Sequence, residues 1–259
     1  MTGSAGVMAL VLTETVAGSA TFLWYTPLWR EVKRGYFTLT GVILSIVAFA
    51  AWRAAAAGAI AGDSAGTWSV RLTLASFVVT VAWTGLQLLK RNPAARVVGF
   101  LSVPVAVAPL VAMATTGRQQ EALSLFELLA GAAFLGSVLD GLLLGHWYLT
   151  DRGLGRTPID RATRILLVAV VVEAIAVIAG GFGGAGSSEA FNPLLTAGAL
   201  APWIALGMVG TTALIAVMVK ATLRGTRASA VQSATGFFYL AVVTAFTAEV
   251  AVKVRFLPR

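Results

Sequence analysis

Eight long apolar segments dominate this sequence, and each has the length of a helix that crosses a membrane. A bilayer core about 30 Å thick needs roughly 20 predominantly apolar residues per helical crossing. The gaps between the segments are short and rich in glycine, proline, asparagine and charged residues, as is typical of turns. The segments span residues 5–28, 37–57, 70–89, 97–115, 124–148, 165–181, 194–219 and 230–252. The sequence therefore predicts an all-α, polytopic transmembrane helix bundle with about eight spans.

Composition supports this fold class and leaves no room for a soluble domain. Of the 259 residues, 58% are hydrophobic and 12% are charged, whereas soluble domains carry about 25% charged residues. So few polar side chains cannot cover a water-exposed surface of this size. We predict a single transmembrane domain over residues 1–259. Because no basic residue precedes the first apolar segment, we expect no cleavable secretory signal.

The basic residues indicate the orientation of the bundle. Most of the 19 Lys and Arg follow the first, third, fifth and seventh segments. Cytoplasmic loops of membrane proteins are enriched in Lys and Arg, so we predict that these loops are cytoplasmic and both termini are outside. Lys253, Arg255 and Arg259 disagree with this orientation, because they follow the last segment and would therefore lie outside. A seven-span topology would accommodate that tail, but it would spoil the alternation elsewhere.

Several classes of function are excluded by residues that the chain lacks. There is no cysteine, and His146 is the single histidine. Fe–S clusters, Cys-ligated zinc and a bis-histidine haem within this chain are therefore excluded. The net charge of +8 comes from basic residues in the short loops between apolar segments, as the positive-inside effect predicts. We therefore expect no nucleic-acid partner. No hydrolase, metalloprotease or phosphate-loop motif is present, which argues against a self-contained enzyme.

Two carboxyl groups deep in apolar segments are candidates for a proton path. Glu14 lies near the middle of the first segment and Glu173 within the sixth. A charged group in the hydrocarbon costs a few kcal/mol or more unless it is paired or wetted. One interpretation is a protonated carboxyl that donates to a backbone carbonyl and has only a structural role. The other is that Glu14 and Glu173 line a polar route for protons.

Two further glutamates have simple structural interpretations. Ser124 and Glu127 fit a capping box at the start of the fifth segment. Glu249 precedes Lys253 by four residues, which is the favourable order for an ion pair on one helix.

The densest polar cluster lies at the cytoplasmic end of the fifth segment. Its members are Asp140, His146, Trp147, Tyr148 and Arg152. A histidine exchanges protons near neutral pH, and the aromatic rings and arginine suit a flat headgroup or a phosphate. We therefore predict a ligand-binding site for a quinone or lipid headgroup here. The alternatives are ordinary interfacial anchors and a protein–protein contact.

The two halves of the chain share a faint similarity. Trp24-Tyr25 precedes a basic loop, and Trp147-Tyr148 precedes another. Three further segments follow in each case, which indicates a four-plus-four duplication of residues 1–120 and 121–259. The alternative is that Trp and Tyr simply favour the membrane interface.

Three hypotheses of function remain open. The first is a membrane subunit of an electron-transfer or proton-handling complex that holds a quinone or lipid headgroup. The second is a proton- or cation-coupled small-molecule transporter, and the third is a scaffold or assembly subunit. The expected partners are membrane lipids and other membrane subunits. Richness in alanine, glycine and arginine is typical of a GC-rich bacterium, so we predict a multi-pass protein of the bacterial cytoplasmic (inner) membrane.

Overall fold

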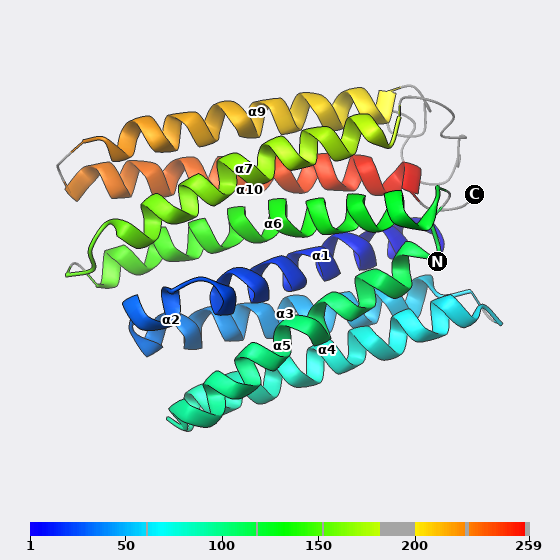
Figure 1. Ribbon diagram of the computed structural model, residues 1–259, viewed down its shortest axis with the longest axis horizontal. Helices are drawn as coiled ribbons and strands as arrows, with labels where there is room; N and C mark the ends of the chain where they lie inside the picture. Colours follow the sequence, from blue (N-terminus) through cyan, green and yellow to red (C-terminus); the bar gives the residue numbers. More distant parts are fainter. Residues whose placement is uncertain (61, 118, 152, 182–199, 226–227, 257–259) are drawn as a thin grey trace.

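The fold is all-helical throughout the part of the chain that the structure describes. The computed structural model describes residues 1–259 except 61, 118, 152, 182–199, 226–227 and 257–259 (Figure 1). The long helices are α1 (Gly3–Tyr25), α3 (Arg34–Gly58), α4 (Ser64–Leu88), α5 (Asn92–Ala114), α6 (Glu121–Thr150), α7 (Thr157–Ala179), α9 (Leu200–Leu223) and α10 (Ala228–Phe256). A short helix, α2 (Leu28–Glu31), joins α1 to α3.

Within the described residues, eight helices are long and apolar enough to cross a membrane, so the predicted polytopic helix bundle is confirmed. Their outer surface is apolar: Ile46, Val168 and Val243 are each about two-thirds exposed. Glutamates and a lysine are instead buried between the helices. This distribution is the inverse of that in a soluble protein and suits lipid as the surrounding solvent.

The helices pack as two groups of four (Figure 1). In the first group, α1 packs on α3, α3 on α4, α4 on α5, and α5 returns to α1. In the second group, α6, α7, α9 and α10 pack in the same cyclic order. The main contact between the groups joins α1 to α6. This order is compatible with the predicted four-plus-four duplication, which stays a prediction.

The α1–α6 contact depends on two glycines. A Cβ atom on Gly18 would lie 1.8 Å from the carbonyl oxygen of Ala132, and one on Gly136 would lie 2.3 Å from the carbonyl carbon of Gly18. Only residues without a side chain allow the backbones to approach so closely. This crossing places α1 at the centre of the bundle and brings Glu14 into its interior.

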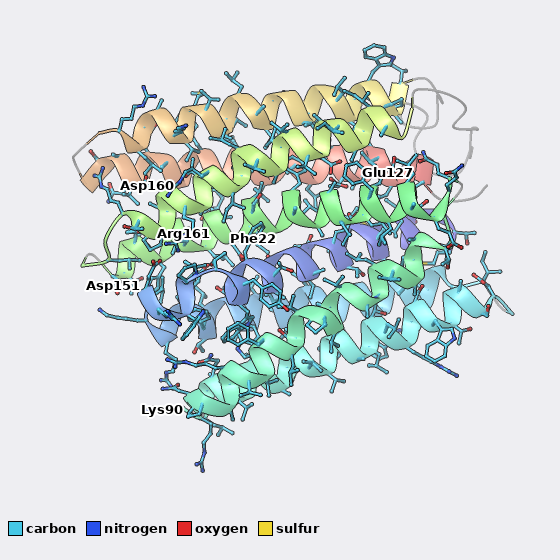
Figure 2. All side chains as sticks on the ribbon, in the orientation of Figure 1. Phe22, Lys90, Glu127, Asp151, Asp160 and Arg161 are labelled. Atoms are coloured by element: carbon cyan, nitrogen blue, oxygen red, sulfur yellow. The ribbon has the colours of Figure 1, made fainter. Side chains whose placement is uncertain are left out.

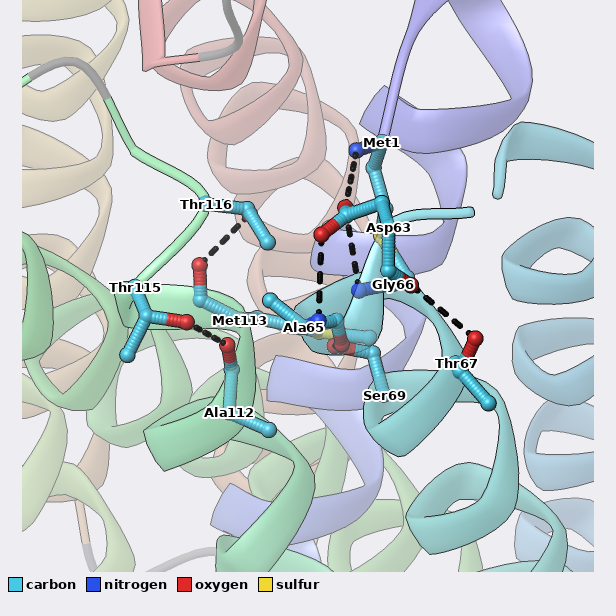
Figure 3. Close-up of polar contacts among 10 residues, drawn as sticks. All are labelled: Met1, Asp63, Ala65, Gly66, Thr67, Ser69, Ala112, Met113, Thr115 and Thr116. Carbon is cyan, nitrogen blue, oxygen red and sulfur yellow. Dashed lines mark hydrogen bonds and ion pairs between the residues drawn. The ribbon is translucent and has the colours of Figure 1, made fainter. Parts of the chain in front are cut away.

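Polar contacts hold the end of the bundle at which α1 begins and α10 ends, which we call the terminal end (Figure 1). Asp63 caps α4, because its carboxylate accepts hydrogen bonds from the N–H groups of Ala65 and Gly66, each 3.0 Å long. The amino group of Met1 lies 4.0 Å from the same carboxylate (Figure 3). An N-cap of this kind satisfies donors that the first helical turn leaves free. The opposite end, with residues 26–33, 89–91 and 153–156, is the basic-loop end.

Two helices begin earlier than the apolar segments predicted from the sequence. Helix α7 begins at Thr157, eight residues before the predicted segment, and α6 begins at Glu121. Hydropathy marks where a helix enters lipid, whereas backbone hydrogen bonding continues into the polar interface. The predicted start of the seventh segment at residue 194 lies outside the described residues.

Lys253 accounts for part of the disagreement over orientation. Its side chain is fully buried between helices, so it is not a loop charge and does not count toward the positive-inside bias. The placement of both termini on the outer face stays a prediction.

Candidate functional site

Five ionisable side chains from four helices meet in the interior of the bundle. They are Glu14 on α1, Glu127 on α6, Glu173 on α7, and Glu249 and Lys253 on α10, and each is at most 1% exposed. We call this group the carboxyl–lysine cluster. Figure 2 shows Glu127 on the half of α6 nearer the terminal end, away from Asp151, Asp160 and Lys90 at the basic-loop end.

Lys253 is the centre of the cluster. Its Nζ lies 2.7 Å from Oε1 of Glu14 and 3.0 Å from Oε2 of Glu249. It also lies 3.5 Å from the backbone carbonyl oxygen of Glu127. An ammonium group has three N–H donors, and these three acceptors from three helices match that number. Lys253 therefore connects α10 to both α1 and α6.

Glu173 extends the cluster to α7. Its buried carboxyl group is an electrostatic neighbour of Glu249, and Glu249 also contacts Lys253. Two ionised carboxylates can only accept hydrogen bonds, so a hydrogen bond between them forms only when one of them carries a proton.

A glycine provides the space for this arrangement. A Cβ atom on Gly131 would lie 2.8 Å from Oε1 of Glu14 and 2.8 Å from Oε2 of Glu249. Both carboxyl groups thus rest against the backbone of α6, where the absence of a side chain leaves room for them beside Lys253.

The cluster contains more carboxyl groups than cations. Four carboxylates and one ammonium would together carry a charge of −3. Each ion removed from water costs several kcal/mol unless a partner compensates it, and one lysine cannot compensate four carboxylates. Protonation of one or more of the carboxyl groups would relieve this imbalance.

The structure brings the two predicted proton-path residues, Glu14 and Glu173, into this one cluster. Their role in moving protons stays a prediction. The predicted ion pair of Glu249 and Lys253 is confirmed, although it is buried rather than a surface pair. The predicted capping box of Ser124 and Glu127 is wrong, because α6 begins three residues before Ser124, at Glu121. Glu127 is instead buried against the bundle interior.

Asp140 is buried nearer the basic-loop end. It lines a cavity of about 20 Å³ together with Phe22 and Arg161, which Figure 2 labels. That volume holds about one water molecule, whereas small-molecule sites usually measure about 300 Å³ or more. The cavity at Asp140 suits a water or a proton better than a quinone ring.

The other residues of the predicted ligand site contact different neighbours. His146 is exposed and lies 3.1 Å from the hydroxyl of Tyr239 on α10. The Trp147 ring lies against Gly35 of α3, and the Tyr148 hydroxyl donates to the carbonyl of Gly155. Arg152 lies outside the described residues. Ligand binding by these residues stays a prediction.

Comparison of the chain with protein-family models, with curated proteins and with solved structures finds no match.

Proposed function

We propose that this multi-pass membrane protein binds and moves protons, with the carboxyl–lysine cluster as its proton-binding site. The observation that carries the proposal is the position of Lys253, 2.7 Å from Glu14 and 3.0 Å from Glu249, with Glu173 next to Glu249. One buried cation is thus shared by carboxyl groups that outnumber it. Buried ionisable groups inside a membrane bundle typically mark ion or proton pathways.

The geometry suggests how a proton controls the cluster. Glu249 has two competing partners, the ammonium of Lys253 and the protonated carboxyl of Glu173. While Glu173 holds its proton, it stabilises the Glu249 carboxylate, and Lys253 is shared with Glu14. When Glu173 loses the proton, the Glu173–Glu249 hydrogen bond is replaced by repulsion between like charges. Lys253 is then drawn toward Glu249 and away from Glu14, which changes how α10 is held to α1.

Asp140 extends this route toward the basic-loop end. It lies nine residues after Gly131 on α6, which corresponds to about 13 Å along the helix. The small cavity beside Asp140 includes Arg161, whose guanidinium binds Glu31 at the surface. A proton entering there would reach Asp140 before the cluster. Because the cluster itself is buried, transfer needs a movement of the helices, as in alternating access.

Proton flux into liposomes tests this proposal. The purified protein is reconstituted with an internal pH dye, and a membrane potential is imposed with a potassium gradient and valinomycin. We expect Glu173→Gln and Lys253→Met to reduce protein-dependent flux about tenfold or more, since general acid–base groups contribute at least that much. The control is Glu121→Gln, at an exposed position at the start of α6. Equal flux in all four proteins would refute the proposal.

A second candidate function is the binding of a quinone or lipid headgroup beside His146, as in a membrane subunit of an electron-transfer complex. The observation that favours it is the exposed His146–Tyr239 pair, whose rings meet edge to face at 5.5 Å. This pair offers a proton donor and acceptor at the lipid-facing surface. Lipid extraction of the native protein should then yield quinone that His146→Ala lacks, and extracts without quinone would remove this candidate.

A further inference from the structure

A second, larger cavity lies in the other group of helices, at the basic-loop end. Its volume is about 200 Å³, and none of the carboxyl–lysine cluster lines it. Its lining includes Trp24, Trp29, Arg34, Gln87, Asn92 and Arg96. They come from α1, α3, α4 and α5 and from the loop that contains α2.

The cavity is positively charged. Arg34 and Arg96 both line it, whereas no Asp or Glu is among its lining residues. Arg34 donates one hydrogen bond, 2.9 Å long, to the carbonyl oxygen of Gln87, which uses one of its five N–H donors. The guanidinium of Arg96 lies 5.1 Å from the centre of the Trp29 ring, a cation–π contact that fixes its position.

Uncharged side chains complete the lining. Trp24, which is 1% exposed, contributes to the wall of the cavity, and Gln87 lies beside Arg34. The Asn92 side chain at the start of α5 offers an amide group at the same cavity. The cavity therefore combines two arginines with neutral donors, the set that binds phosphate oxygens.

We propose that this cavity binds a phosphate group, from either an anionic phospholipid or a free phosphate. Basic pockets between transmembrane helices are suited to phosphate headgroups. The neighbouring Trp29 lies on α2, between two membrane-length helices, and aromatic side chains are enriched at such helix ends. The proposal does not depend on the proton-handling function, because the two sites share no residue.

The test has one arm for each source of phosphate. In the first, the protein is purified with phosphatidylglycerol, washed with detergent, and its retained lipid is measured by native mass spectrometry. In the second, the delipidated protein is titrated with inorganic phosphate, and its thermal stability is followed. Arg96→Gln is the main variant because the exposed side chain is not needed for packing. Arg71→Gln is the matched control, since Arg71 lies over Trp68 at 5.5 Å but does not line this cavity.

Charge-assisted hydrogen bonds account for about tenfold or more in affinity. If the ligand is a lipid, we expect Arg96→Gln to retain about tenfold less phosphatidylglycerol, or less still, than the unmodified protein in the first arm. If the ligand is a free anion, Arg96→Gln should need about tenfold or more phosphate for the same stabilisation. Arg71→Gln should match the unmodified protein in both arms. Absence of binding by the unmodified protein, or equal binding by Arg96→Gln in both arms, would overturn the proposal.

Discussion

Replacement of Lys253 by methionine is the most informative perturbation of the bundle. Methionine keeps the length of the side chain but removes the ammonium that contacts Glu14 at 2.7 Å and Glu249 at 3.0 Å. Removing one partner of a buried ion pair typically costs about 3–5 kcal/mol, because it leaves the other charge uncompensated. We expect Lys253→Met to lower the free energy of unfolding by about that amount at neutral pH.

The assay is reversible unfolding in mixed detergent micelles, with an exposed ion pair as the control. Lys33 contacts Asp151 at the same 3.0 Å distance, but its side chain is 75% exposed, so Lys33→Met should cost about 0–1 kcal/mol. The double variant Glu14→Gln with Lys253→Met should be less destabilised than the sum of the single variants, by about 0.5–3 kcal/mol. The reasoning is refuted if Lys253→Met costs no more than Lys33→Met.

Three further predictions follow from the packing and the surface charges. Gly131→Ala should destabilise the fold by about 1–3 kcal/mol by crowding the carboxyl groups, whereas Gly207→Ala, where a Cβ meets nothing within 4 Å, should be neutral or slightly stabilising in the same unfolding assay. Gly18→Ala should cost at least as much as Gly131→Ala, because its Cβ meets backbone; a neutral result would contradict the close helix crossing. The hydrogen bond from Arg161 lowers the pKa of Glu31 from its ordinary value of 4.5, so the pair stabilises the protein above that pH. This contribution, under about 1 kcal/mol for a surface pair, should fade as the pH falls below 4.5. In stability measured against pH, the unmodified protein should exceed Glu31→Gln above pH 4.5 and converge with it at lower pH. Identical curves would exclude this contribution.

The eight membrane-length helices among the described residues could be predicted from the sequence because a bilayer imposes a strict length on each apolar segment. Segment ends were less accurate where polar helical turns precede the lipid. The first turns of α7, from Thr157, are helical but carry Asp160 and Arg161, so hydropathy alone places the start too late.

The candidate site was predicted only in part. Glu14 and Glu173 stood out because they interrupt apolar segments, and the four-residue spacing of Glu249 and Lys253 indicated their pair. The sequence did not reveal that Glu127, Glu249 and Lys253 join the same cluster, because which faces of α1, α6, α7 and α10 meet depends on tertiary packing. The available signal was Gly131, four residues after Glu127, where a helix face without side chains leaves room for neighbouring carboxyl groups.

Infrared spectroscopy of the carboxyl groups tests the central claim most directly. A protonated carboxyl group has a C=O stretching band distinct from that of a carboxylate, and it can be recorded for the reconstituted protein at neutral pH. We predict such a band in the unmodified protein, a clear loss of its amplitude in Glu173→Gln, and no change in Glu121→Gln. A spectrum that Glu173→Gln and Glu249→Gln both leave unchanged would show that the cluster holds no proton there, and would contradict the account.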